Sequence, residues 1–394
     1  MLGFATFSAL LPELRDAWRL SNSEAGLIGS AFFTGYIATV AYWTALTDRV
    51  DGRRVYLAGG LLTAAGSLGF AILAEGLATA MLFQALMGAG VAATYMPGLR
   101  LLSDRVTGRA QSRAVAFYTS FFGIGIALSL GLAGVVAPTW GWQAAFAVGA
   151  LGPAIAAALV MLGIEAIAPP DSSRPRFSLR TLFPIDAWRR VLAIPAAAGY
   201  TLGYGVHCVE LFGSRAWTVA FLVYAGGLHA TGATFPWSAA TIAAVVSVAS
   251  VPASIVGNEF ALRIGRRPWV LLVMTVSAVC GIALSLSAPW HWAILLALLL
   301  IYSMLVMADS GTLTAGLVAA VPPELRGAAM GFYSLVGFAG GMIGPTLFGA
   351  ALDLAGGETN ASAWVWAYVA IGAGCLSAPL AVRLFGHGEG KMRA

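Results

Sequence analysis

The chain has 394 residues, of which 59% are hydrophobic and 10% are charged, and its mean hydropathy is +0.84. Such a composition excludes an ordinary water-soluble globular domain and predicts a multi-pass protein of the lipid bilayer. The formal net charge of +5 does not indicate a nucleic-acid partner, because the basic residues are dispersed over short segments and do not gather on one face.

Eleven apolar runs approach or exceed the roughly 20 residues that a helix needs to cross a bilayer. In chain order they cover residues 25–46, 56–74, 78–102, 114–137, 142–164, 192–224, 237–260, 269–288, 291–319, 328–352 and 362–385. The stretch before them, Met1 to Leu11, is apolar but only about half as long as a span. We interpret it as the outer half of a first helix whose beginning is lost through a wrongly chosen start codon; a short, tilted helix is the alternative. The first interpretation predicts twelve spans with both termini in the cytoplasm.

Lys and Arg residues fall in every second gap between the runs. The gaps at 47–55, 103–114, 165–191, 261–268 and 321–327 carry them, whereas the gaps around Glu75, Trp140, His229, Trp290 and Glu358 carry none. Cytoplasmic loops of membrane proteins show this excess of basic residues. The pattern therefore predicts the topology, and we expect a location in the cell inner membrane. Arg15 and Arg19 break the pattern, because on this topology they lie outside the cytoplasm.

The sequence also repeats itself. Gly52-Arg53-Arg54 follows the second predicted span, and Gly265-Arg266-Arg267 follows the eighth, 213 residues later. Phe117-Tyr118 and Phe332-Tyr333 are related by a similar offset of 215 residues. We therefore predict an all-α protein with two pseudo-symmetric halves, at 1–164 and 191–394, joined by a cytoplasmic linker at 165–190. Repeated halves with a binding site between them are typical of alternating-access transporters.

The loop after the second span carries the most specific motif. It reads Thr47-Asp48-Arg49-Val50-Asp51-Gly52-Arg53-Arg54 and resembles the Gly-x-x-x-Asp-Arg-x-Gly-Arg-Arg motif of the major facilitator superfamily. Two departures are the extra residue Asp51 and the presence of Thr44 at the leading glycine position. The copy at Arg263-Ile-Gly-Arg-Arg267 keeps the basic end but lacks the acid.

This resemblance covers essentially the whole chain and implies twelve transmembrane helices in two six-helix halves. It also implies a gate at the inner ends of the halves, formed by Asp48, Arg49, Gly52, Arg53, Arg54, Arg266 and Arg267. The alternative is that these arginines only fix the topology. Other family signatures are missing: Gln84 stands where proton-coupled members usually carry an intramembrane arginine, and no Gly-Pro pair of antiporters occurs at 123–131. Neither proton antiport nor drug efflux therefore follows from the resemblance.

Ionisable residues within the runs are the candidates for the transport site, because charge at bilayer depth is costly and is usually functional. The candidates for substrate or proton binding are Glu210, Asp309, His207, Arg215, Arg100, Tyr95 and Tyr204. His207 and Glu210 share one face of a helix, but Arg215 is turned away from Glu210 by about 140°. A direct Glu210–Arg215 pair would need a helix break at Gly213; otherwise each residue has a partner on another helix.

Each candidate also has a purely structural interpretation. Glu210 and Asp309 could belong to interhelical ion pairs that only hold the fold, and Arg100 could extend to the cytoplasmic interface. The three cysteines all lie within apolar runs, which is typical of small buried residues and not of a disulfide framework.

These observations predict a secondary active transporter that moves a small polar or charged solute by alternating access. Proton symport is the first hypothesis for its energy source. The alternatives are a facilitated uniporter of the same fold and a transport-dead receptor. We expect no enzyme activity, because the sequence has no metalloprotease His-Glu-x-x-His and no hydrolase Gly-x-Ser-x-Gly motif. We also expect no cofactor, no metal and a monomeric state.

Overall fold

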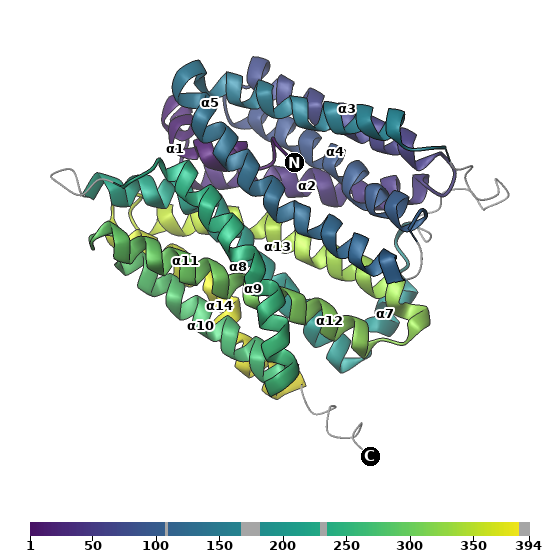
Figure 1. Ribbon diagram of the computed structural model, residues 1–394. Helices are drawn as coiled ribbons and strands as arrows, with labels where there is room; N and C mark the ends of the chain where they lie inside the picture. The colour runs from purple at the N-terminus through teal and green to yellow at the C-terminus, as the bar shows by residue number, and fades with distance from the viewer. Residues whose placement is uncertain (107–108, 167–181, 229–234, 386–394) are drawn as a thin grey trace. The chain divides into compact units, whose positions relative to one another are not determined.

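A computed structural model describes residues 1–106, 109–166, 182–228 and 235–385, and within these ranges the chain forms helices and no β-strand (Figure 1). The helices are α1 (Thr6–Trp18), α2 (Asn22–Leu46), α3 (Gly52–Leu73), α4 (Leu77–Ser103), α5 (Arg109–Gly163), α7 (Ile185–Leu192), α8 (Pro195–Leu228), α9 (Ala239–Ile264), α10 (Arg266–Leu286), α11 (Trp292–Ala308), α12 (Ser310–Ala320), the short 3-10 helix η1 (Pro323–Leu325), α13 (Arg326–Leu354) and α14 (Ala361–Phe385). Ten of the eleven predicted runs coincide with a single helix apart from a few residues at their ends, whereas the run 291–319 is divided between α11 and α12.

The predicted all-α membrane fold is confirmed. Nine segments of the described chain are long and apolar enough to cross a bilayer. One of them, within α5, is two spans, because Gly141 has a non-helical conformation (φ 82°, ψ 164°) that interrupts the 55-residue helix. That division, with the short α1 and with α14, gives the twelve predicted elements. Glycine suits the position because a side chain there would strain a backbone with positive φ.

The helices group into two compact units that are not the two continuous halves of the sequence. The first unit contains Met1–Leu20, Leu27–Phe183 and Trp237–Val248. The second contains Ser21–Gly26, Pro184–Pro236 and Ala249–Ala394. The first turn of α2 therefore groups with the second unit. The division at 1–164, 165–190 and 191–394 stays a prediction, and most of the linker lies outside the described residues.

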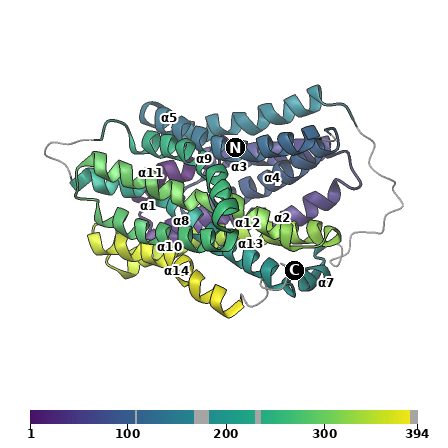
Figure 2. The same ribbon diagram turned by 60° about the horizontal axis from the view of Figure 1, so that its bottom comes forward.

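In the first unit, α3 packs against both α4 and α5, as the views in Figures 1 and 2 agree. Phe70 of α3 stacks on Phe146 of α5 with ring centroids 3.9 Å apart. One turn earlier, the hydroxyl of Ser67 donates to the carbonyl oxygen of Phe146 at 2.7 Å. These contacts satisfy a buried polar group and join α3 to α5.

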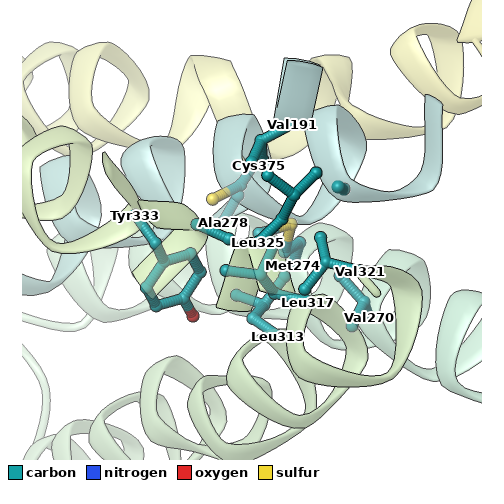
Figure 3. Packing of buried hydrophobic residues seen from close by; sticks show 12 residues of the cluster. Val191, Val270, Met274, Ala278, Leu313, Leu317, Val321, Leu325, Tyr333 and Cys375 are labelled. Carbon is teal, nitrogen blue, oxygen red and sulfur yellow. The ribbon is translucent and has the colours of Figure 1, made fainter. Parts of the chain in front are cut away.

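In the second unit, α8 packs along α13, and α10 packs along α14. The first pair is in near backbone contact, because a Cβ at Gly213 would lie 3.1 Å from the carbonyl oxygen of Gly344. Small residues allow this approach between membrane helices. A cluster of buried apolar side chains joins α7, α8, α10, α12, α13 and α14, and Figure 3 shows it around Met274, Leu317 and Tyr333.

Two short local features accompany these helices. Ser21 and Glu24, at the Ser-x-x-Glu spacing, form a capping box at the start of α2: the backbone N–H of Ser21 donates to Glu24 Oε2 at 2.8 Å, and that of Glu24 donates to Ser21 Oγ at 3.2 Å. The end of the linker forms helix α7, whose Trp188 packs against Phe332 with ring centroids 5.2 Å apart.

The start of α2 also has a partner that the sequence did not reveal. Asp353, near the end of α13, accepts hydrogen bonds from the backbone and side chain of Asn22 at 3.1 and 2.8 Å. It accepts two more from the backbone and hydroxyl of Ser23 at 2.7 and 2.6 Å. A carboxylate at a helix amino terminus satisfies free N–H groups and is favoured by the helix dipole.

Candidate functional site

A broken helix carries the central residue of the candidate site. The apolar stretch Trp292–Ala320 is interrupted at Asp309, which ends α11 and precedes α12. Two neighbours support the break. Trp269 of α10 donates from Nε1 to the carbonyl oxygen of Ala308 at 3.1 Å, and Gly257 of α9 lies so close to the Ala308 backbone that a Cβ there would overlap it. Asp309 itself keeps right-handed helical dihedral angles (φ −96°, ψ −19°), so the break is a local interruption of one residue.

His207 of α8 faces Asp309 at this break. Its Nδ1 lies 2.8 Å from Asp309 Oδ1, and the two side chains are only 2% and 3% exposed. Nδ1 and Oδ1 are within ion-pair distance, and the contact joins opposite charges when the imidazole is protonated; Oδ1 accepts no hydrogen bond of good geometry from the described residues. The other nitrogen, Nε2, is buried and has no hydrogen-bond partner among the described residues. The structure therefore brings together two predicted candidates, His207 and Asp309, and leaves Nε2 of His207 available for a further hydrogen bond.

Aromatic rings continue from this pair. Tyr204 stacks on His207 with ring centroids 5.7 Å apart, and on its other side it stacks on Tyr333 of α13 at 3.8 Å. The hydroxyl of Tyr333 lies 3.0 Å from that of Thr314 in α12. The stack fixes the orientation of the imidazole and joins it to the helix on the far side of the break.

Glu210 lies one turn after His207 but has a separate set of partners. Its Oε2 lies 2.9 Å from Ser277 Oγ of α10 and 3.1 Å from Cys375 Sγ of α14. Ser277 Oγ also lies 3.0 Å from the carbonyl oxygen of Met274. A hydroxyl has one proton and cannot donate to both acceptors, so a carboxylic acid that donates to Ser277 would satisfy all three groups. No cation lies within ion-pair distance of Glu210 in the parts of the chain that the structure describes.

Arg215 does not pair with Glu210. Helix α8 runs unbroken from Pro195 to Leu228, so the break considered at Gly213 does not occur. Arg215 donates from Nη2 to the thioether of Met307 in α11 at 3.3 Å. The expectation that each residue would have a partner on another helix is confirmed, although neither partner carries the opposite charge.

The remaining binding candidates, Arg100 and Tyr95, lie in the first unit. Arg100 pairs with the motif loop: its Nη1 lies 2.6 Å from Asp48 Oδ1 and 2.8 Å from Thr47 Oγ1. Tyr95 stacks on Tyr118 with ring centroids 5.8 Å apart. Arg100 is thus held to the motif loop, which the sequence did not indicate.

The motif loop contains a second ion pair. Asp51, the extra residue of the motif, caps α3 and lies 2.8 Å from Arg53 Nη2. Arg53 also donates to the carbonyl oxygen of Ile164 at 2.7 Å. Burial raises the pKa of the Asp51 carboxyl, but hydrogen bonds from the side chain and backbone of Arg53, with the charges of Arg53 and Arg105, outweigh this effect and hold that pKa below its usual range.

The other gate candidates are placed as follows: Arg49 lies between α2 and α3, Gly52 begins α3 against the Leu101 side chain, Arg54 is exposed, and Arg266 and Arg267 begin α10. The gate itself stays a prediction. Sequence reasoning missed Ser277, Trp269 and the role of Cys375. Cys375 is buried, as expected, but it also contacts a carboxyl group. No spacing rule indicates these partners, because they come from other helices.

Comparison with known proteins identifies the family. The model of the Major Facilitator Superfamily matches residues 1–345 and again residues 203–392. The chain belongs to the major facilitator superfamily.

Two curated members of the superfamily show what this chain is similar to. NiaP of Bacillus subtilis (strain 168), provisionally named a niacin/nicotinamide transporter, is 23% identical over 348 residues, which are 87% of this chain and 82% of that protein. The niacin transporter NiaP of Acinetobacter baylyi (strain ATCC 33305 / BD413 / ADP1) is 27% identical, but over 37% of this chain and 33% of its own length.

Solved structures of the superfamily share the fold. A bacterial homolog of the human lysosomal transporter Spinster, in an inward-facing and occupied conformation, has a TM-score of 0.75 at 14% identity and covers 98% of this chain and 92% of that one. The nucleoside transporter NupG has a TM-score of 0.72 at 15% identity, with 98% and 97% covered. The protein is therefore a multi-pass membrane transporter of small molecules that works by alternating access, and it is not an enzyme.

Proposed function

We propose that this transporter is a secondary active symporter that couples the movement of a small polar or charged solute to protons through the His207–Asp309 pair. One observation carries the proposal: an ionisable pair, 2% and 3% exposed, at a break in a membrane helix. An ion pair removed from water is a poor source of stability. Its presence at this depth therefore favours a functional role.

The arrangement supports proton exchange in a simple way. An ionised Asp309 and a protonated His207 attract each other at 2.8 Å. When Asp309 takes up a proton, that attraction is lost, and His207 can use either nitrogen toward a solute. Protonation thus changes the hydrogen-bonding character of the site between two states, which is what coupling requires.

Glu210 belongs to the same proposal in a different role. Its partners, Ser277 and Cys375, are neutral groups on α10 and α14. It lies one turn from His207 on the same face of α8 and can hold a second proton near the pair. We also propose that Asp48, Arg49, Gly52, Arg53, Arg54, Arg266 and Arg267 form an inner gate. The contacts of Asp48 with Arg100 and of Arg53 with Asp51 support an ordered loop there.

Solute uptake into proteoliposomes tests the coupling. The panel begins with niacin and nicotinamide, because the NiaP relatives are named for them, and continues with sugars, amino acids and nucleosides. We expect the wild type to accumulate its solute when the outside is more acidic. Asp309→Asn should abolish this accumulation while solute exchange at equal pH continues.

Glu259→Gln is the matched control, because it also removes a carboxylate from a helix of the second unit but at an exposed position on α9. It should accumulate solute like the wild type. Accumulation by Asp309→Asn that still follows the pH gradient would show that this pair does not couple transport to protons. A wild type that exchanges solute but ignores the gradient would instead favour uniport.

A further inference from the structure

Arg215 is a cation in a membrane helix, and no acid among the described residues pairs with it. Within the described chain its hydrogen bond goes to Met307 Sδ at 3.3 Å, and no carboxylate lies within ion-pair distance. A thioether is a weak acceptor. Long side chains on a helix point toward its amino terminus, which for Arg215 is the direction of His207.

The acids of this region are occupied by other partners. Asp309 faces His207, and Glu210 is bonded to Ser277 and Cys375. The unbroken α8 also separates Arg215 from Glu210, since five residues correspond to about 7.5 Å along the axis and about 140° around it. The described residues of this unit therefore supply no negative charge to Arg215.

Other arginines of the protein contrast with this one. Arg100 lies 2.6 Å from Asp48, and Arg53 lies 2.8 Å from Asp51. Both are at the ends of their helices, where water can also solvate them. Arg215 is in the middle of the 34-residue α8, where an unneutralised charge is costly. A cation at such a position is explained if its partner arrives with the solute.

We propose that Arg215 binds the carboxylate of the transported solute, so that the substrates of this protein are small organic monocarboxylates. The inference rests on the proposed transport function and specifies its substrate class. The planar guanidinium matches a carboxylate with two parallel hydrogen bonds, which a thioether cannot offer. Met307 is then the resting partner that the solute replaces. Helices α8 and α11, which carry the two residues, lie side by side (Figure 1).

Acid–amide pairs of equal shape test this assignment. Uptake is measured in proteoliposomes at saturating pH gradient and without one, for nicotinate against nicotinamide and benzoate against benzamide. We expect the wild type to favour the acids. Arg215→Gln should raise the KM for the acids by roughly 10- to 100-fold, the loss of a charge-assisted pair, and leave the amides unchanged. Arg215→Lys should recover part of the affinity, because it restores the positive charge but not the two parallel hydrogen bonds of the guanidinium.

Arg326→Gln is the control for loss of one positive charge, since Arg326 is exposed at the start of α13. It should leave the preference for acids intact. Size-exclusion chromatography of each variant shows whether it folds.

Three results would overturn the inference: a wild type that carries only neutral solutes, an Arg215→Gln variant with an unchanged KM for acids, or one that loses acids and amides equally. The first two leave the protein a transporter. A wild type that carries no solute at all, with or without the gradient, defeats the proposed function and this inference with it.

Discussion

The His207–Asp309 contact predicts a measurable coupling between two side chains. At 2.8 Å, opposite unit charges attract by about 6 kcal/mol if the effective dielectric constant is about 20. Desolvation offsets much of this attraction, but removing one partner leaves the other charge buried, at a cost of about 3–5 kcal/mol. Asp309→Asn and His207→Gln should therefore each lower stability strongly. The double variant should lose much less than the sum, because it leaves no uncompensated charge.

A double-mutant cycle measures this coupling. The purified protein in detergent is heated with a thiol-reactive dye, which reports unfolding because Cys208 and Cys375 are buried. For a chain of this size we expect a Tm loss of roughly 2 °C for each kcal/mol, hence about 6–10 °C for each single variant. The double variant should unfold within a few degrees of the milder single one. Additive Tm losses would refute the ion pair and with it the coupling proposal.

Three further outcomes follow from contacts outside the pair. Trp269→Phe keeps an aromatic ring against Phe260 but removes the hydrogen bond that Trp269 donates to the Ala308 carbonyl oxygen. The free energy of unfolding should therefore fall by about 1–3 kcal/mol, measured by thermal unfolding. An unchanged Tm would mean that the break at Asp309 does not need this bond. In Asp353→Asn, the single side-chain oxygen can accept hydrogen bonds from only one of the two donor residues, Asn22 and Ser23. The free energy of unfolding should fall by about 1–2 kcal/mol by the same measurement. Asp353→Glu should recover part of this loss. Asp51→Asn keeps a good N-cap side chain but loses the ion pair with Arg53, so it should cost roughly 0.5 kcal/mol above pH 5. Because the pKa of Asp51 is lowered in the folded protein, this difference should shrink as the pH falls below about 4, and a difference that grows in acid would contradict the assignment.

The spans were predictable because bilayer thickness sets their length and composition. Ten of the apolar runs fall in a single helix, and even the interruption between 114–137 and 142–164 appears in the structure, at Gly141. The capping-box spacing of Ser21 and Glu24 is likewise a short local pattern, and the structure contains the box. Such features depend on neighbours within one turn of the chain, so the sequence contains all the information that they need.

The partners of the site residues were not predictable in the same way. His207 and Asp309 are 102 positions apart, and their contact depends on an interruption of Trp292–Ala320 at Asp309, which the following Ser310 and Gly311 do not by themselves predict. A break at Gly213 was considered, but α8 continues through it because the glycine serves close packing against Gly344. The energetic cost of charge at bilayer depth selected the candidate site residues. Only the packing of separate helices decides which of them meet.

The glycine contacts between α8 and α13 have a mechanical consequence. A Cβ at Gly344 would overlap the carbonyl oxygen of Val209 and lie 2.8 Å from the backbone nitrogen of Gly213, so the two backbones leave no room for a methyl group there. Sliding one helix past the other would therefore require the two helices to separate first. Helices α8 and α13 should therefore move together as one rigid body during the transport cycle. The distance between spin labels attached to the two helices should stay constant during transport. The conformational change should then occur in elements that are less tightly packed.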